Sequence, residues 1–183
     1  MSSAVEQALD RFVQSHLEQN ANQPPQIEFD SEWPSECYQS QPNSDGQVDW
    51  QPVRQQQHND LFERLEQALE VAIHPDIKAY YDRYWSDPLP AQSPEGQLNL
   101  LFVWNPEDLE RLRANLIGHA LGRQRLKQPL SFFFGCTSPE EFVLAIDNDS
   151  GQVMLEQPGK RKSDLIAPSL AEFIDQLTPL ANQ

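Results

Sequence analysis

The sequence predicts an α/β fold in which a central mixed, largely antiparallel sheet is packed by helices, in one domain spanning residues 1–183. Two observations carry this prediction. First, the apolar run LNLLFVW (98–104) precedes a helical pattern over 106–127. Such a buried strand and one-sided helix need further elements to cover them. Second, three β-type runs follow the helix, at 130–136, 141–148 and 152–156. A chain of 183 residues can bury the core that this fold needs.

The first third of the chain is expected to combine one helix with a long coil. Residues 3–19 have an amphipathic pattern, and Ser3 with Glu6 matches a capping box. Residues 20–57 are rich in proline and glutamine, so we expect an extended coil with a short edge strand at 48–52. Because disordered linkers rarely contain two tryptophans, the aromatic residues of this coil should pin it to the body of the protein.

The middle of the chain predicts two shorter helices followed by a loop. Residues 59–73 and 76–85 each have an apolar stripe at helical spacing, and His74-Pro75 interrupts the pattern between them. The segment 86–96 (SDPLPAQSPEG) contains several prolines and is expected to form a loop.

The long helix over 106–127 has clear signals at both ends. Asn105 offers an N-cap oxygen, Pro106 suits the first helical position, and Pro129 stops the run. Its inward face should consist of four small or aliphatic residues, Leu109, Leu112, Leu116 and Ala120.

The last third is expected to form the sheet and a closing helix. The turn sequence NDSG (148–151) joins the runs 141–148 and 152–156 into a hairpin. A basic loop follows at 158–162, and the capping-box pair Ser169 and Glu172 starts the final amphipathic helix.

The formal net charge of −15 is the strongest global property of the chain. Residues 1–100 contain 17 acidic and 5 basic residues, so the acidity belongs to the first half. Nucleic acids and anionic lipids both bind basic surfaces, so we expect no nucleic-acid partner and no direct lipid binding. The charge favours either a basic partner or a role in solubility alone.

The sequence contains no recognisable catalytic or cofactor motif. Cys37 and Cys136 lie far apart, which is typical of a reducing compartment, and no 18-residue apolar run is present. We therefore expect a cytoplasmic protein. The histidines lack metal-ligand spacing, and a structural role is the favoured interpretation of His119. No phosphate-binding loop or nucleophile elbow occurs, so we expect no enzyme, no cofactor and no metal.

One charge pattern remains as a candidate binding site. Acidic residues follow the outer side of the predicted helix 59–73 and continue through Asp76, Asp82 and Asp87 over the next segment. The candidate binding residues among them are Glu63, Glu66, Glu70, Asp76 and Asp82. The coil acids Glu28, Asp30, Glu32 and Glu36 are expected to approach the same region. These residues form either an acidic docking groove for a basic partner or simply a solvated helix face.

Several segments resemble the Syd family. They are WP at 33–34, WQP at 50–52, LEQALEVAIHPDIKAYYDRYW at 65–85, NLIGH at 115–119, RLKQP at 125–129 and LAEFIDQLTPL at 170–180. The resemblance spans nearly the whole chain, and NLIGH with RLKQP is its most specific part. The coil at 35–49 (SECYQSQPNSDGQVD) departs from the family pattern.

The resemblance implies a SUKH-like fold and a SecY-interacting protein. Such a protein would dock a concave acidic surface onto basic cytosolic loops of the SecY translocon. It would thereby become peripheral to the cytoplasmic face of the inner membrane, with a role in quality control of abnormal SecYEG. The resemblance implies no catalytic residue. The alternative is a SUKH-type, immunity-like protein that masks a basic toxin domain.

Overall fold

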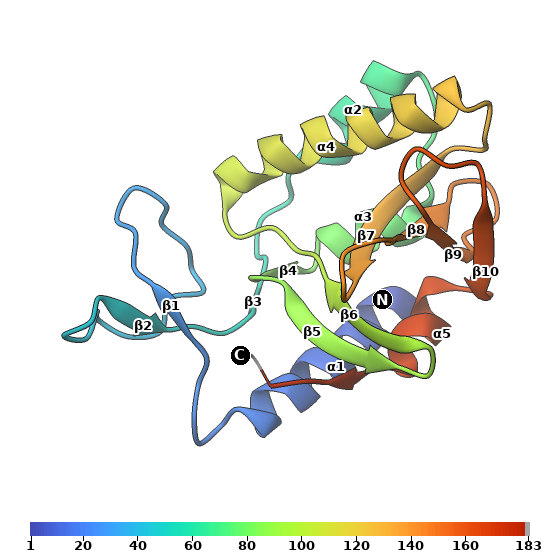
Figure 1. Ribbon diagram of the computed structural model, residues 1–183. Helices are drawn as coiled ribbons and strands as arrows, with labels where there is room; N and C mark the ends of the chain where they lie inside the picture. Colours follow the sequence, from blue (N-terminus) through green and yellow to red (C-terminus); the bar gives the residue numbers. More distant parts are fainter. Residues whose placement is uncertain (182–183) are drawn as a thin grey trace.

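A computed structural model describes residues 1–181 of the chain (Figure 1). The helices in this range are α1 (Ala4–Gln19), α2 (Leu61–Leu69), α3 (Pro75–Tyr81), α4 (Pro106–Arg125) and α5 (Leu170–Asp175). The strands are β1 (Gln26–Glu28), β2 (Gln47–Asp49), β3 (Val53–Arg54), β4 (Tyr84–Trp85), β5 (Leu89–Ser93), β6 (Gly96–Leu100), β7 (Ser131–Thr137), β8 (Val143–Asp147), β9 (Val153–Glu156), β10 (Ser163–Ala167) and β11 (Thr178–Pro179).

The central sheet has seven strands in the order β10-β9-β8-β7-β6-β5-β11. Each neighbouring pair in it is antiparallel, and a parallel pairing occurs as the isolated bridge between Trp85 and Val103. Two small sheets, β1-β2 and β3-β4, lie beside it. The predicted α/β class with a largely antiparallel sheet is therefore confirmed.

The helices cover the sheet in two groups. α4 packs against β7 and α2, whereas α1 packs against α5 and α3 (Figure 1). Buried aromatic rings fill the core between them: the hydroxyl of Tyr80 donates to the carbonyl of Leu101 at 2.9 Å, and that of Tyr81 donates to Phe133 at 2.8 Å. Buried tyrosine hydroxyls need such partners, and here they are backbone carbonyls of β7 and of the segment after β6.

α4 begins and packs as its sequence predicts. The side chain of Asn105 accepts a hydrogen bond from the backbone N–H of Asp108 at 2.9 Å, which caps the helix. Leu109, Leu112, Leu116 and Ala120 are buried, with Leu116 and Ala120 fully so. The helix ends at Arg125, two residues before the predicted end, and Lys127 has a left-handed φ of 54°.

The turn after β8 holds the start of α3. Gly151 has φ 75°, and a Cβ atom there would lie 2.5 Å from the His74 imidazole, so only glycine fits this close approach. Asn148 accepts a hydrogen bond from the His74 N–H at 2.8 Å and donates one to the Ala72 carbonyl at 2.9 Å.

Larger differences from the prediction occur in four segments. The strand predicted at 98–104 ends at Leu100, because residues 101–104 turn away to bridge Trp85 through Val103. The helix predicted at 59–73 is α2, which stops before Glu70, a residue with a left-handed φ of 53°. The segment predicted as helix over 76–85 leaves the helix after Tyr81 and ends as β4.

The fourth difference is the segment 86–96, which the sequence analysis takes as a loop. It contains β5, in which Leu89, Ala91 and Ser93 are buried in alternation. Prolines at 88 and 90 hide this strand pattern from sequence analysis, since proline cannot donate to a ladder. Pro90 is tolerated here because the neighbour on one side is the two-residue strand β11. Strands β10 and β11 were also absent from the prediction.

A candidate docking groove beside α4

The coil over 20–57, here called the coil arm, is fastened to the start of α4. Trp50 is buried and meets Trp104 edge-on, with ring centroids 5.8 Å apart. Ser35 donates a hydrogen bond to the Trp104 carbonyl at 2.7 Å, and Asn105 donates one to the Pro34 carbonyl at 2.9 Å. The arm is therefore held by both aromatic packing and hydrogen bonds, and its hairpin β1-β2 projects beside the body (Figure 1).

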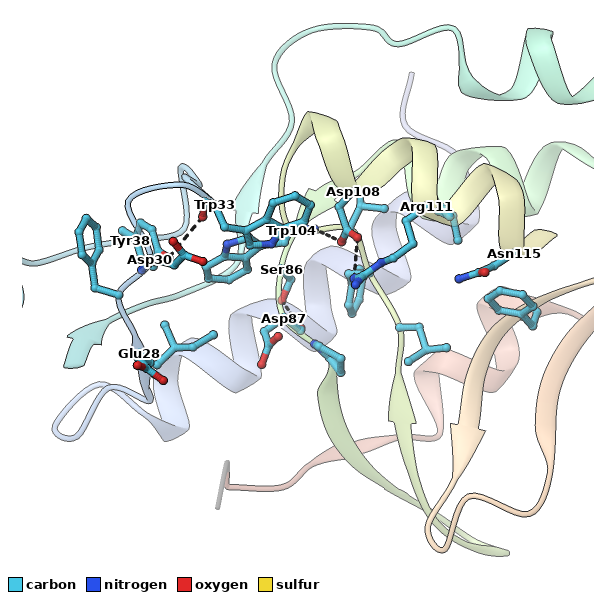
Figure 2. A pocket seen from close by; sticks show the side chains of 18 residues that line it. Glu28, Asp30, Trp33, Tyr38, Ser86, Asp87, Trp104, Asp108, Arg111 and Asn115 are labelled. Atoms are coloured by element: carbon cyan, nitrogen blue, oxygen red, sulfur yellow. Dashed lines mark hydrogen bonds and ion pairs between the residues drawn. The ribbon is translucent and has the colours of Figure 1, made fainter. Parts of the chain in front are cut away.

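A hollow of about 820 Å³ lies between the coil arm and α4. We call it the acidic groove. Its four carboxylates come from three segments of the chain: Glu28 and Asp30 from the coil arm, Asp87, and Asp108. Its aromatic residues are Phe29, Trp33, Tyr38, Phe102, Trp104 and Phe133. Arg111 is the one basic residue that lines it within the described part of the chain (Figure 2).

Asp108 is a fixed and neutralised member of the groove. Its carboxylate is almost fully buried, accepts a hydrogen bond from the Trp104 N–H at 2.9 Å and pairs with the guanidinium of Arg111 at 2.6 Å. This carboxylate therefore braces the turn into α4, and its charge is already balanced by a neighbour one turn along the helix.

Asp87 has the opposite character. The pKa of its carboxyl is raised, first by burial and then by the negative charge of Asp108. Within residues 1–181, no donor or cation partners this carboxylate. Its backbone is held firmly, because the N–H of Ser86 donates to the Val103 carbonyl at 2.9 Å and the Ser86 hydroxyl donates to the Asp87 carbonyl at 2.7 Å. In Figure 2, Asp87 lies between the coil-arm acids and Arg111.

A second hollow of about 660 Å³ adjoins the acidic groove. Asp87, Pro88 and Leu101 line both hollows, so the two hollows adjoin at these residues. Farther along, the second hollow is lined by Asn99, Cys136 and Glu140.

The five acids predicted as a docking face lie elsewhere, because none of them lines the acidic groove. On α2, the carboxylate of Glu63 lies 2.8 Å from the His58 imidazole, and Glu66 pairs with Lys78 at 2.5 Å. Glu66 also accepts a hydrogen bond from the Ile73 N–H at 3.1 Å. The Lys78 contact is the main reason that the pKa of Glu66 is lowered.

The remaining three predicted acids continue the same surface. Glu70 is exposed at the end of α2, and Asp76 lies 4.0 Å from the His74 imidazole. Asp82 accepts a hydrogen bond from Asn59 at 3.2 Å, and burial raises its pKa. We call Glu63, Glu66, Glu70, Asp76 and Asp82 the α2–α3 patch. The structure brings these residues onto neighbouring helices but sets Lys78 and two histidines among them.

The coil acids are divided between sites. Glu28 and Asp30 line the acidic groove, whereas Glu36 lines a small hollow beside Pro106. The five predicted site residues include neither Asp87 nor Asp108. The acidic pattern in the sequence nevertheless extends to Asp87, whereas Asp108 is assigned there only to the first turn of the helix that follows Trp104.

His119 belongs to a buried polar cluster. Its Nε2 lies 3.0 Å from the Ser131 hydroxyl and 3.1 Å from the Glu156 carboxylate, and Arg123 lies 3.9 Å from the same carboxylate. Burial opposes ionisation of Glu156, but contacts with His119 and Ser131 and the charge of Arg123 lower its pKa. Because serine and carboxylate share one ring nitrogen, this is not a relay of the nucleophile–histidine–acid type.

Over residues 1–181, no helix is long and apolar enough to cross a membrane. In the same range, no group of three or more histidine, cysteine, aspartate or glutamate side chains could hold a metal ion.

The chain is similar to known proteins over almost its whole length. A family model described as Syd protein (SUKH-2) matches residues 2–179. The chain is 43% identical over 188 residues to Protein Syd of Pseudoalteromonas atlantica, with 98% of both chains covered. It is 44% identical over 180 residues to Protein Syd of Alteromonas mediterranea, covering 98% of this chain and 99% of that one. The corresponding protein of Colwellia psychrerythraea is 38% identical over 188 residues, with 97% and 94% covered.

Proposed function

The chain belongs to the Syd protein family (SUKH-2), and from that premise we propose that it is a non-enzymatic SecY-interacting protein. In this proposal the acidic groove docks on basic cytosolic loops of the SecY translocon. The observation that carries it is the groove itself, a hollow of about 820 Å³ with four carboxylates, several aromatic side chains and a single basic residue among the described residues.

The composition of the groove suits a basic loop. Aromatic faces attract the cationic side chains of lysine and arginine, and carboxylates at the rim steer such a segment toward the protein. The coil arm contributes Glu28 and Asp30, and residues 87 and 108 contribute the opposite side. Because the arm is fastened at Trp104, the groove is largely formed before a partner binds, which lowers the cost of ordering.

The α2–α3 patch is proposed as a second, outer contact. Its acids are exposed or partly exposed, and Lys78 and His58 offset part of their charge. Such a surface contributes to the rate of association more than to final affinity. Through SecY the protein would become peripheral to the cytoplasmic face of the inner membrane, with quality control of abnormal SecYEG as its role.

A binding experiment tests this proposal. Purified protein would be mixed with vesicles containing SecYEG and with protein-free vesicles, including anionic ones. Retention by the SecYEG vesicles alone is expected, since a net charge of −15 disfavours binding to anionic lipid. Equal retention by both vesicle types, or by neither, would refute SecY docking.

Variants then locate the docking surface. Glu28→Lys combined with Asp30→Lys should abolish most binding to SecYEG vesicles. The matched control is Glu18→Lys with Asp149→Lys, which changes net charge equally at exposed positions outside the groove. Recovery of a soluble basic toxin domain instead of SecY in pull-downs would favour the immunity-like alternative.

A further inference from the structure

Asp87 is a half-buried carboxylate whose charge is not balanced within residues 1–181. Burial and the neighbouring charge of Asp108 both oppose its ionisation. Asp108 differs in this respect, because Arg111 pairs with it at 2.6 Å. A partly buried carboxylate without a balancing cation destabilises the folded protein, and a cation supplied by a partner would remove this destabilisation.

Asp87 lies where the acidic groove and the second hollow adjoin. Asp87, Pro88 and Leu101 are the residues shared by the acidic groove and the second hollow. An extended segment that occupies both must therefore pass the Asp87 side chain. The hydrogen bond from the Ser86 N–H to the Val103 carbonyl holds the backbone beside Asp87 at this junction.

The aromatic residues that line the groove together with Asp87 favour an arginine side chain over a lysine side chain. Phe102 and Trp104 line the same groove, and the rings of Tyr38 and Trp104 meet edge-on with centroids 5.4 Å apart. A guanidinium is planar, weakly hydrated and able to stack on aromatic faces, whereas an ammonium is strongly hydrated and compact. The Arg111–Asp108 pair on the adjoining wall is an example of a guanidinium bound to a carboxylate in this environment.

We propose that the Asp87 carboxylate binds an arginine side chain of an extended basic segment that lies across the acidic groove and the second hollow. This inference deepens the proposed function and rests on it for the identity of the partner. The chemistry of the site, however, requires only an arginine-containing segment of extended chain.

Synthetic peptides test the inference without SecY. The probe is a short acetylated and amidated peptide of glycine and serine with one central arginine, and matched peptides contain lysine or uncharged citrulline. Binding is followed by the NMR signals of the tryptophan indoles, since Trp33 and Trp104 line the groove. The arginine peptide should bind more tightly than the lysine peptide, and the citrulline peptide should bind at least about tenfold more weakly.

Asp87→Asn should weaken binding of the arginine peptide by about tenfold or more and leave the citrulline peptide unchanged. The control is Asp149→Asn, the same chemical change in an exposed turn outside both hollows, which should have no effect. Equal affinity of wild type and Asp87→Asn for the arginine peptide would overturn the inference. So would equal affinity of wild type for arginine and citrulline.

Cysteine alkylation tests the extended path. Cys136 lines the second hollow and is partly exposed, whereas Cys37 is fully buried and burial raises its pKa to about 12. An arginine peptide extended by several residues on each side should slow alkylation of Cys136, with Cys37 as the unreactive internal reference. An unchanged rate would overturn the path across both hollows. Peptide binding without retention by SecYEG vesicles would refute only the proposed function, and retention without an Asp87 effect would refute only this inference.

Discussion

The guanidinium of Arg111 lies 2.6 Å from the carboxylate of Asp108, although the arginine side chain is 70% exposed and the aspartate side chain only 6%. The arginine thus covers a buried acid at the wall of the acidic groove and places one positive charge among its carboxylates. A basic partner that enters the groove must approach this charge. Arg111 is therefore expected to weaken the electrostatic attraction of the groove for its partner.

Arg111→Gln should raise the association rate with SecYEG vesicles by roughly two- to threefold at low salt, with a smaller gain at physiological salt. Arg113→Gln is the matched control, because Arg113 lies on the same helix and pairs with Glu110 at 3.3 Å, outside the groove lining. Association rates on immobilised SecYEG, measured for wild type and both variants, test this prediction. An equal gain from both variants would mean that only net charge matters.

The inward face of α4 makes a prediction about stability. Leu116 is fully buried, so Leu116→Ala should lower the free energy of unfolding by about 2–5 kcal/mol. Leu121 on the same helix is 41% exposed, and Leu121→Ala should change it by no more than about 0.5 kcal/mol. Urea denaturation measures both. A loss below roughly 1 kcal/mol for Leu116→Ala would contradict the packing described here.

α4 and β5 show how far the sequence determines the fold. α4 was predicted to within two residues because its signals are local: Asn105 caps it and Pro106 occupies its first position. β5 was missed because its prolines contradict the strand pattern, and Pro90 is acceptable only next to the two-residue strand β11. That neighbour is set by the tertiary fold, which no local pattern reveals.

The acidic groove lay beyond sequence analysis for the same reason. Helical spacing predicts that Glu63 and Glu66 lie close together, because they are on one helix. Glu28, Asp87 and Asp108 come from separate segments and meet only through tertiary contacts, such as the hydrogen bond from Ser35 to Trp104. The sequence therefore indicated an acidic binding protein, whereas locating this groove required the structure.

His16 makes the stability of the protein depend on pH. Burial lowers the pKa of this histidine, and its Nε2 has no hydrogen-bond partner among the described residues. The folded state favours neutral His16, so the unfolded state binds more protons below the unperturbed pKa of about 6.5. The stabilising contribution is therefore complete above that pH and is lost as the pH falls below it.

His16→Leu should reduce the loss of stability between pH 7.5 and pH 5.5. His58→Gln is the control, since the His58 side chain is 71% exposed. Urea denaturation at both pH values gives the difference for each protein. An unchanged pH dependence in His16→Leu would show that other groups cause it.

Asp87 is expected to lower the stability of the folded protein, although it contributes to the proposed binding of a basic partner. Its pKa is raised in the folded state by burial and by Asp108, so the folded state favours the protonated form. At pH 7 the ionised carboxylate therefore destabilises the fold. This penalty decreases as the pH falls through the raised folded-state pKa, and it is gone below the unperturbed pKa of about 3.9. Asp87→Asn should raise the midpoint of thermal unfolding at pH 7, where about 2–4 °C corresponds to 1 kcal/mol in a domain of this size. A lower midpoint would contradict the unbalanced charge assigned to Asp87.

The α2–α3 patch makes the last prediction. If its acids meet basic SecY loops, they act as exposed charges, which govern the rate of association and its salt dependence. Binding should weaken as salt rises to physiological strength, where charges more than about 8 Å apart are largely screened. Glu63 is exposed on α2 and Glu70 is exposed directly after its end, so reversing both to lysine should slow association and leave the fold intact.

Two other acids, Glu66 and Glu156, are unsuitable for charge reversal. Glu66 accepts a hydrogen bond from the Ile73 N–H, and Glu156 is buried beside His119, so reversing either would disturb the fold. The control is again Glu18→Lys with Asp149→Lys. Association rates on immobilised SecYEG would be compared at two salt concentrations for wild type and both double variants. A loss confined to Glu63 and Glu70 would establish the patch as a second contact, because both double variants change the net charge equally. Equal losses from the two double variants would mean that the α2–α3 patch acts only through net charge. The acidic groove would then be the one localised docking surface in the proposal.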